Sequence, residues 1–369
     1  MDWATLARPE IFRIQPYSPG KPIAEVEREL GLRDVIKLAS NENPLGPSPR
    51  AVAALAQAIS SVHFYPESRP PLLRRRLAEL NGVSPDQVIV GNGSDELIKL
   101  LAETFLRPGD EVLLPAPTFS EYEFAAHLMG ARPVSVPCRD FKPDWERMVQ
   151  AVTERTRMIF LPSPNNPTGR ALREEELISL LSGVPPAVLV VVDEAYREYA
   201  EDPLYHRDSP RLLTRFANLV LLRTFSKIYG LAGLRIGYGL ADPAVIDLVY
   251  RVCEPFNVNA LAQEAALAAL DDEEHLAASR ENNRRGKEYL EAELKALGLN
   301  PVPTEANFFF VGLGRDCREV FRALLQRGII VRTGDIFGEP EYIRVTIGTP
   351  EQNRRLIQAL AEVVGGGRR

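Results

Sequence analysis

The 369-residue sequence has few cysteines and no long apolar run. Its three cysteines, Cys138, Cys253 and Cys317, lie far apart and form no CxxC pair. This spacing argues against a disulfide framework or a zinc site, so we expect no metal and a reducing compartment. The N-terminal stretch has no apolar segment typical of a signal peptide, and no run of about 18 apolar residues is present. The sequence therefore predicts a cytoplasmic protein without a membrane span.

An excess of positive charge is also missing. The chain has 44 Lys and Arg against 50 Asp and Glu, which gives a net charge of -6. Binding to nucleic acid or to an anionic membrane requires a basic face, so we expect neither partner. A charged fraction of 25% and a hydrophobic fraction of 45% are those of an ordinary globular protein, and the length suits about two domains.

Five short apolar runs organise the middle of the chain. Each ends in polar or glycine residues and is followed by a helical segment, as in βαβ units. Apolarity without alternation predicts strands that are covered on both faces. We therefore expect an α/β fold whose large domain has a mostly parallel central sheet flanked by helices. The runs are QVIV at 87–90, EVLL at 111–114, MIFL at 158–161, AVLVVV at 187–192 and LVLL at 219–222.

The pattern changes near residue 273, where a long charged helical segment begins and continues to about 297. The strand-like FFFVGL, a helix near 316–326, and the strand-like IIVR and YIRVTIG follow. This order predicts a smaller α+β domain. We divide the chain into an N-terminal arm with part of the small domain at 1–44, a large domain at 45–265 and a small C-terminal domain at 266–369.

Polar residues follow directly after four of the five apolar runs. Ligands of open α/β sheets bind beyond the carboxyl ends of the strands, so we expect these residues to converge on one crevice. They would supply an anion-binding turn, an amide, a carboxylate with a tyrosine, and a lysine. The segments are GNGSDE at 91–96, PSPNNPTG at 162–169, DEAY at 193–196 and RTFSK at 223–227.

Each of these segments also has a purely structural interpretation. The glycines of GNGSDE let backbone N–H groups approach a phosphate at a helix N-terminus, but they also suit a simple N-cap turn. A dinucleotide fingerprint would require glycine where Glu96 stands. Asp193 is costly to bury without a partner, which could be a protonated ring nitrogen or a structural donor. Asn166 is equally suited to a turn.

Lys227 is the only lysine between Lys142 and Lys287. Arginine would supply the same charge, so this position favours an amine that can lose its proton and act as a nucleophile or base. Alone, it could be a surface lysine in a loop. Beside the other three segments, it suits a Schiff base with a phosphorylated aldehyde cofactor.

These motifs together resemble the histidinol-phosphate aminotransferase family, which belongs to the fold-type I pyridoxal 5'-phosphate (PLP) enzymes. The similarity extends from IFRIQPYSPGKPI at 11–23 to YIRVTIGTPEQN at 342–353. It rests on SNENPLGPSP at 40–49, GNGSDE at 91–96, SPNNPTG at 163–169, DEAY at 193–196 and TFSKIYGLAGLRIGYGL at 224–240.

The resemblance implies PLP as cofactor and assigns a role to each motif. Lys227 would form the Schiff base and move the proton during transamination, and Asp193 would pair with the pyridine nitrogen. Tyr196 and Asn166 would bind the phenolic oxygen of the cofactor. The phosphate would be held by Ser94, Asp95, Ser226 and Arg235.

Two aromatic residues complete the implied cofactor site. Tyr65 matches a tyrosine that reaches the phosphate from the neighbouring subunit, which implies a homodimer. Phe119 takes the position at which the family commonly has a tyrosine stacked on the cofactor ring. Stacking needs no hydroxyl, so this departure would change substrate preference more than cofactor binding.

On the substrate side, the resemblance implies two anion-binding arginines, Arg332 and Arg344, with Tyr17 and Asn43 nearby. Guanidinium groups suit both carboxylate and phosphate. The implied reaction is the transfer of an amino group between L-histidinol phosphate and 2-oxoglutarate, which gives imidazole-acetol phosphate and L-glutamate. An aromatic amino acid aminotransferase, a threonine-phosphate decarboxylase and a PLP-binding regulator without activity remain as alternatives.

Overall fold

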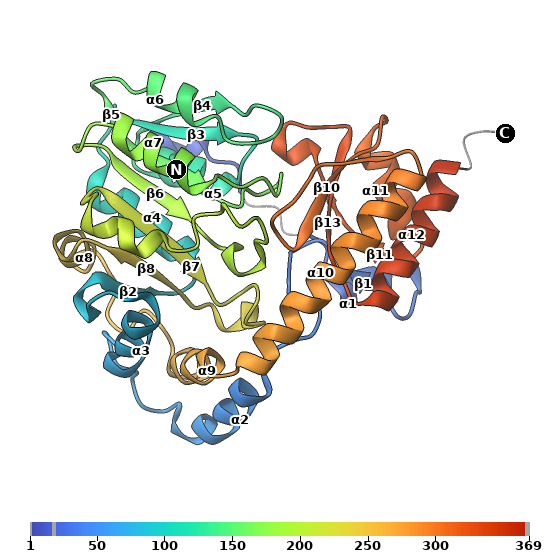
Figure 1. The fold of residues 1–369 in the computed structure, drawn as a ribbon, viewed down its shortest axis with the longest axis horizontal. Coiled ribbons are helices and arrows are strands. Elements are labelled where there is room, and N and C mark those ends of the chain that lie inside the picture. The colour runs from blue at the N-terminus through green and yellow to red at the C-terminus, as the bar shows by residue number, and fades with distance from the viewer. Residues whose placement is uncertain (1, 17–19, 366–369) are drawn as a thin grey trace.

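The computed structural model describes residues 2–16 and 20–365. A seven-stranded sheet lies in the larger half of the molecule (Figure 1). The strand order is β2-β8-β7-β6-β5-β3-β4, and among these strands only β8 runs antiparallel to its neighbours. The predicted α/β fold with a mostly parallel sheet is therefore confirmed. The strands are β2 (Val88–Gly91), β3 (Glu111–Ala116), β4 (Arg132–Pro137), β5 (Thr156–Pro162), β6 (Leu189–Asp193), β7 (Leu219–Thr224) and β8 (Gly237–Ala241).

Helices cover both faces of this sheet. Successive strand residues point to opposite faces, so that in β5 Ile159 and Leu161 pack into one core and Met158 and Phe160 into the other. The first core also contains residues of α2 (Pro49–Ala58), α3 (Pro71–Asn81), α6 (Trp145–Gln150), α7 (Glu174–Gly183) and α9 (Ala260–Leu270). The second contains residues of α4 (Ser94–Phe105), α5 (Ser120–Leu128) and α8 (Pro243–Val249).

A smaller group of elements packs around a separate core. Its antiparallel sheet has the order β12-β13-β10-β9, and a short parallel pair, β1 with β11, lies beside it. The strands are β1 (Ile36–Lys37), β9 (Asn300–Pro301), β10 (Phe308–Gly312), β11 (Ile329–Ile330), β12 (Arg332–Thr333) and β13 (Tyr342–Thr346). The helices are α1 (Ile23–Leu30), α10 (Glu273–Ala296), α11 (Cys317–Leu325) and α12 (Pro350–Gly365).

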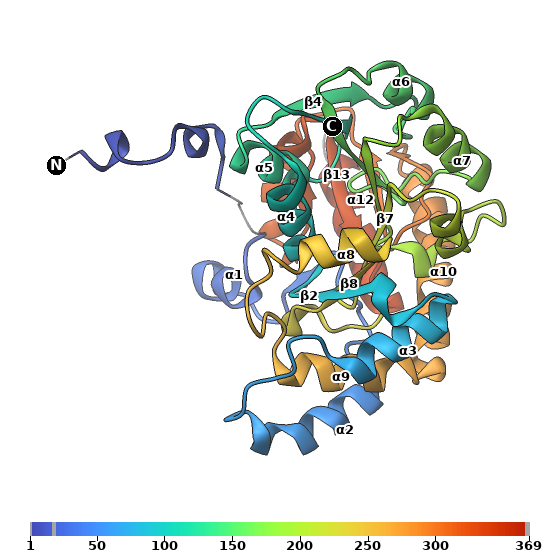
Figure 2. The same cartoon turned by 90° about the vertical axis from the view of Figure 1, so that its left-hand side faces the viewer.

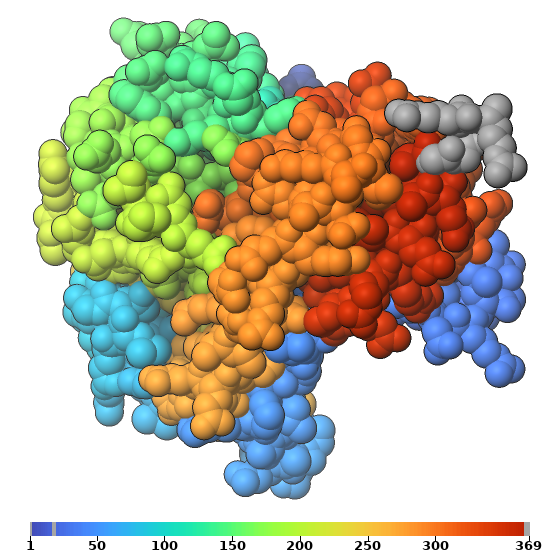
Figure 3. Space-filling model, turned by 45° about the vertical axis from the view of Figure 1, so that its right-hand side comes forward, coloured from blue at the N-terminus to red at the C-terminus, as the bar shows by residue number. Residues whose placement is uncertain are grey.

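The helix α10 connects the two groups, and Figure 3 shows it in orange between the green and red parts of the surface. Its N-cap residue Asp272 accepts a hydrogen bond from the Ser48 hydroxyl at 2.6 Å. The Asn43 amide donates to Ser279 Oγ of α10 at 2.9 Å. The predicted domain boundaries at 44/45 and 265/266 stay a prediction.

Two strands of the large sheet, β4 and β8, were not expected from the sequence. β4 is the edge strand and contains two prolines, and β8 contains Gly237 and Gly239, so neither has the expected apolar run. A Cβ on Gly237 would lie 2.6 Å from Ser94 N and 2.8 Å from Arg223 O. The glycine therefore lets β8 pack against the start of α4.

The N-terminal segment extends away from the rest of the molecule (Figure 2). Two short 3-10 helices, η1 (Trp3–Thr5) and η2 (Pro9–Arg13), form it, and Arg8 donates to Leu128 O at 2.6 Å. Within residues 2–16 and 20–365, no helix has both the length and the apolarity needed to cross a membrane.

Candidate active site

One cavity of about 250 Å³ lies at the carboxyl ends of β5, β6 and β7, where the sequence predicted that polar residues converge. Side chains from both halves of the molecule line it, because Arg344 comes from β13 of the smaller sheet. Of the predicted site residues, the lining includes Ser94, Asp95, Phe119, Asn166, Asp193, Tyr196, Ser226, Lys227, Arg235 and Arg344. Their individual roles stay predictions.

Asp193 is the last residue of β6, and its carboxylate is held on two sides. Tyr122 OH donates to Oδ2 at 2.8 Å, and Ala195 N donates to Oδ1 at 3.0 Å. Burial raises the pKa of Asp193 to about 6, although both hydrogen bonds act in the opposite direction. The carboxylate is therefore fixed in orientation but poorly stabilised in its charged form.

Lys227 and Tyr196 form hydrogen bonds with two adjacent residues, Ser40 and Asn41. Lys227 Nζ donates to Ser40 O at 3.0 Å and lies 5.6 Å from the centroid of the Tyr196 ring. The Tyr196 hydroxyl accepts a hydrogen bond from Asn41 Nδ2 at 3.0 Å. Both side chains are thus oriented by Ser40 and Asn41, which lie a few residues after the end of β1.

The start of α4 forms an anion-binding corner of the cavity. Gly93 is the N-cap with a φ of 82°, and a Cβ there would lie 2.6 Å from Arg235 Nη2. Arg235 donates to Ser226 Oγ at 3.3 Å and to Asp95 Oδ2 at 2.9 Å. Backbone N–H groups at a helix N-terminus, a hydroxyl and a guanidinium together suit a phosphate group.

Arg344 closes the opposite side of the cavity. Its Nη1 donates to Asn166 Oδ1 and its Nη2 to Ala39 O, both at 2.5 Å, and its side chain is buried. The guanidinium carbon lies 5.5 Å from the ring centroid of Phe308 and 5.7 Å from that of Phe337. An anion that enters the cavity would meet a guanidinium that has two aromatic rings nearby.

Four predicted residues are not among those that line the cavity. Tyr65 is 83% exposed, and its ring stacks on Phe256 with centroids 4.7 Å apart. Arg332 stands opposite Arg344 in the register of β12 and β13. Both hydrogen bonds of the Asn43 amide nitrogen go to structural partners, Ile228 O and Ser279 Oγ. Tyr17 lies outside the described residues.

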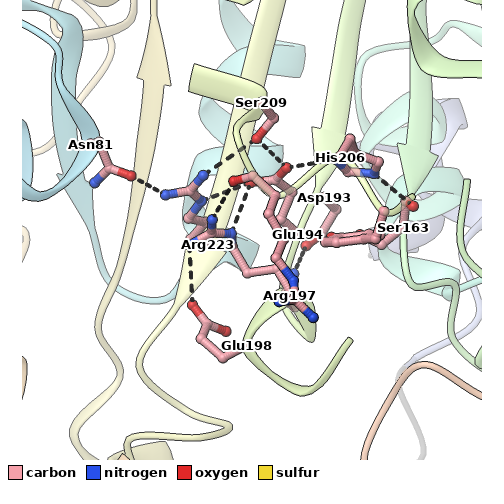
Figure 4. A network of polar contacts seen from close by, with 12 residues as sticks. Asn81, Ser163, Asp193, Glu194, Arg197, Glu198, His206, Ser209 and Arg223 are labelled. Atoms are coloured by element: carbon pink, nitrogen blue, oxygen red, sulfur yellow. Dashed lines mark hydrogen bonds and ion pairs between the residues drawn. The ribbon is translucent and has the colours of Figure 1, made fainter. Parts of the chain in front are cut away.

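Figure 4 shows a buried polar network beside the cavity. Glu194 accepts hydrogen bonds from Arg223 Nε at 2.7 Å and Ser209 Oγ at 2.5 Å, and lies 3.1 Å from His206 Nδ1. His206 Nε2 in turn lies 2.9 Å from Ser163 Oγ. Burial opposes ionisation of Glu194, but the Arg223 charge and the His206 hydrogen bond outweigh it and hold the pKa of Glu194 below its usual range. The network joins the ends of β5, β6 and β7.

The cavity fits the PLP that the resemblance implies. Asp193 is a buried carboxylate that forms no ion pair with any residue in 2–16 and 20–365. A protonated ring nitrogen would supply the missing cation, while the amine of Lys227 and the corner at α4 suit an aldehyde and a phosphate. Within the same ranges, no cluster of three or more His, Cys, Asp or Glu suits a metal ion.

Sequence reasoning missed Tyr122, Ser40 and Asn41. Tyr122 lies one helical turn beyond Phe119, a spacing that places both residues on one side of α5, and their rings contact edge to face at 5.8 Å. Ser40 and Asn41 belong to the motif SNENPLGPSP, from which only Asn43 was predicted as a site residue. The available signal was an asparagine able to adopt a left-handed backbone, and Asn41 has a φ of 56°.

Known proteins resemble this chain along nearly its whole length. A family model described as aminotransferase class I and II matches residues 33–360. A histidinol-phosphate aminotransferase of Moorella thermoacetica is 56% identical over 357 residues, which cover 97% of this chain and 92% of the relative. That of Symbiobacterium thermophilum is 51% identical over 360 residues, which cover 98% and 99%. The crystal structure of histidinol-phosphate aminotransferase from Sinorhizobium meliloti in complex with pyridoxal-5'-phosphate gives a TM-score of 0.90 at 27% identity and covers 97% of both chains.

Asp193→Asn is expected to stabilise the protein freed of cofactor at neutral pH. Because the folded state raises the pKa of Asp193 to about 6, its contribution to the free energy of unfolding falls as pH rises from about 4 to about 6. At pH 7.5 the amide removes this penalty and should add between about 1 and 3 kcal/mol. Urea unfolding at pH 4.5 and pH 7.5 measures the difference.

The matched control for this experiment is Asp86→Asn, because the Asp86 side chain is 85% exposed. We expect no pH-dependent gain from that change. The burial argument would be contradicted by an equal increase in the free energy of unfolding in both variants. It would also be contradicted if the increase from Asp193→Asn were larger at pH 4.5 than at pH 7.5.

Arg223→Met is expected to lower the free energy of unfolding by about 3 kcal/mol or more, because Glu194 would remain buried without its main cation. Arg251→Met serves as control, since it breaks an arginine–aspartate pair whose side chains are 72% and 61% exposed. Surface pairs contribute little, so this control should unfold close to wild type. Equal stability of Arg223→Met and wild type would refute the anchoring role of the network.

Proposed function

This chain belongs to the class I and II aminotransferases, and from that membership we propose that it transfers an amino group between L-histidinol phosphate and 2-oxoglutarate. The products are imidazole-acetol phosphate and L-glutamate, the reaction of histidine biosynthesis, and the cofactor is PLP. Identities of 56% and 51% to named histidinol-phosphate aminotransferases support the substrate assignment.

The observation that carries the proposal is the convergence of three chemical groups in one cavity. An amine, a buried carboxylate without a cation partner among the described residues, and an anion-binding helix N-terminus all line it. Ser94 and Lys227 are more than a hundred residues apart in the sequence, with Asp193 between them, so their meeting is a property of the fold. Together these groups are what a phosphorylated pyridine aldehyde requires.

The residues of the chain divide the work of catalysis. When bound, PLP supplies an aldehyde that accepts the amino group and a ring that delocalises the electron pair left on the substrate carbon. Lys227 takes the proton from that carbon and returns it during the exchange. Asp193 would keep the ring nitrogen protonated, and Tyr196 and Asn166 would orient the phenolic oxygen. Ser94, Asp95, Ser226 and Arg235 would hold the phosphate, and Phe119 would supply an aromatic contact to the ring.

The substrate anions are held by arginine. Arg344 already projects its guanidinium into the cavity, and Arg332 is its neighbour on the adjacent strand. We include Tyr17 and Asn43 in the substrate site as the motifs imply. A bidentate guanidinium accepts a carboxylate and a phosphate equally well, which suits an enzyme that binds two different anions in turn.

We further propose that the enzyme is a cytoplasmic homodimer in which Tyr65 reaches the phosphate of the partner's cofactor. Large apolar side chains are exposed on the N-terminal segment and on residues 59–65, a feature that marks interaction surfaces. The free thiols of the three cysteines suit a reducing compartment. The exposed residues are Trp3, Leu6, Phe12, Ile59, Val62, Phe64 and Tyr65.

The first test is a comparison of kcat/KM for histidinol phosphate, phenylalanine and tyrosine with 2-oxoglutarate as acceptor. We expect histidinol phosphate to exceed both amino acids by at least about 100-fold, because a site that hydrogen-bonds the polar groups of its substrate rejects analogues that lack those groups. A preference for phenylalanine or tyrosine would instead assign an aromatic aminotransferase.

Further arms of this test separate the remaining alternatives. Lys227→Ala should bind PLP but lose turnover, because no other amine lines the cavity among the described residues. Carbon dioxide release from threonine phosphate would indicate a decarboxylase. A cofactor absorption band that no amino donor changes would indicate a binding protein without activity.

Hybrid dimers test the contribution of Tyr65. Tyr65→Ala and Lys227→Ala homodimers should each have less than about 5% of wild-type activity, since each lacks a part of every site. Subunits mixed by mild denaturation and refolding would form hybrids with one intact site, so activity should recover to roughly a quarter of wild type. No recovery would mean that Tyr65 acts within its own subunit, whereas an active Tyr65→Ala homodimer would mean that Tyr65 does not act in the site.

A further inference from the structure

Three consecutive residues after β1 contact three side chains of the candidate site. Ala39 O accepts a hydrogen bond from Arg344 Nη2, and Ser40 O accepts one from Lys227 Nζ at 3.0 Å. Asn41 Nδ2 donates to the Tyr196 hydroxyl at 3.0 Å. The two carbonyls are backbone groups that any residue would supply, but the third contact depends on the Asn41 side chain.

The orientation of the Asn41 amide follows from its neighbours. Thr346 Oγ1 accepts a hydrogen bond from Asn41 N at 2.9 Å, so its own proton is available for Asn41 Oδ1 at 3.1 Å. With Oδ1 occupied as an acceptor, Nδ2 must face Tyr196 as a donor. Asn307 Nδ2 donates to Asn41 O at 3.0 Å. Every polar group of Asn41 therefore has a partner, and its side chain is buried.

This donor decides what the Tyr196 hydroxyl can do. A phenol has one proton to donate, and an oxygen that accepts from an amide directs that proton elsewhere. An accepted hydrogen bond also polarises the hydroxyl and strengthens it as a donor. Tyr196 lines the cavity, so the open direction for its proton is toward a ligand there.

We propose that Asn41 is a positioning residue that acts through Tyr196: its amide directs the tyrosine proton toward the oxygen that the bound cofactor presents. This inference rests on the proposed function. Because Thr346 of β13 fixes the orientation of the Asn41 amide, the smaller sheet sets the position of a hydroxyl on the larger half.

The test is a double-mutant cycle between Asn41→Gly and Tyr196→Phe in the PLP-bound protein. Glycine tolerates the left-handed backbone of Asn41, so the substitution removes the amide with little backbone strain. We expect kcat to fall about tenfold in Asn41→Gly. In the Tyr196→Phe background the same change should alter kcat by less than about twofold, because the hydroxyl on which Asn41 acts is already gone.

A second readout does not depend on turnover. A phenol that donates to the cofactor oxygen stabilises its anionic form, so loss of the Asn41 amide should move the pH midpoint of the cofactor absorption change upward by about half a unit. Tyr196→Phe should move it further, and the double variant should match Tyr196→Phe. The titration is recorded with the charged neighbours Lys227, Asp193, Asp95, Arg235 and Arg344 intact.

Asn307→Ala is the matched control. It removes an amide that holds the same backbone but does not touch the tyrosine, so we expect lower thermal stability and an unchanged midpoint. Asn41→Asp keeps the size of the side chain and covers the case in which Asn41→Gly fails to fold. The new carboxylate would accept a hydrogen bond from the Tyr196 hydroxyl. Asn41→Asp should therefore raise the pH midpoint of the cofactor absorption change at least as much as Asn41→Gly does.

The outcomes separate this inference from the proposed function. Effects of Asn41→Gly that are equal with and without the Tyr196 hydroxyl, or a midpoint that moves as much in Asn307→Ala, would overturn the positioning role alone. A wild-type protein that forms no absorbing complex with PLP would overturn both proposals.

Discussion

Glu194 and Arg223 carry opposite charges at the carboxyl ends of adjacent parallel strands, where neither side chain reaches water. Each side chain alone would be costly to bury, and together they fix the spacing of β6 and β7. Asp193 precedes Glu194 and therefore points to the opposite face of the sheet. The same arrangement that satisfies one carboxylate thus leaves its neighbour facing the cavity without an ion-pair partner among the residues that the structure describes.

The two halves of the molecule share the site rather than merely enclosing it. The larger sheet provides the amine, the carboxylate and the phosphate corner, while β13 provides Arg344 and, through Asn41, a constraint on Tyr196. Arg344 of β13 thus donates to Asn166, while Thr346 of the same strand holds Asn41, which donates one hydrogen bond to Tyr196.

Much of this could be read from the sequence, for a physical reason. Lys227, Asp193 and Asn166 each follow an apolar run, and the carboxyl ends of parallel strands meet at one edge. The sequence could not place Asn41, because its partners Tyr196 and Thr346 are 155 and 305 positions away. It also gave no sign of β8, because Gly237 serves close packing rather than burial of a side chain. Tyr122 was missed because a buried tyrosine looks like core until its hydroxyl is followed to a partner.

The helix α10 has a mechanical consequence. Hydrogen bonds from Ser48 to Asp272 and from Asn43 to Ser279 pin its first turns to the larger half. Its 24 residues rise about 1.5 Å each, so the far end lies about 36 Å away, and a tilt of about 5° displaces it by about 3 Å. A small change in the angle of α10 therefore produces a much larger displacement at its C-terminal end. Because Leu290 and Leu294 near that end belong to the smaller core, a small tilt of α10 would carry the smaller core with it.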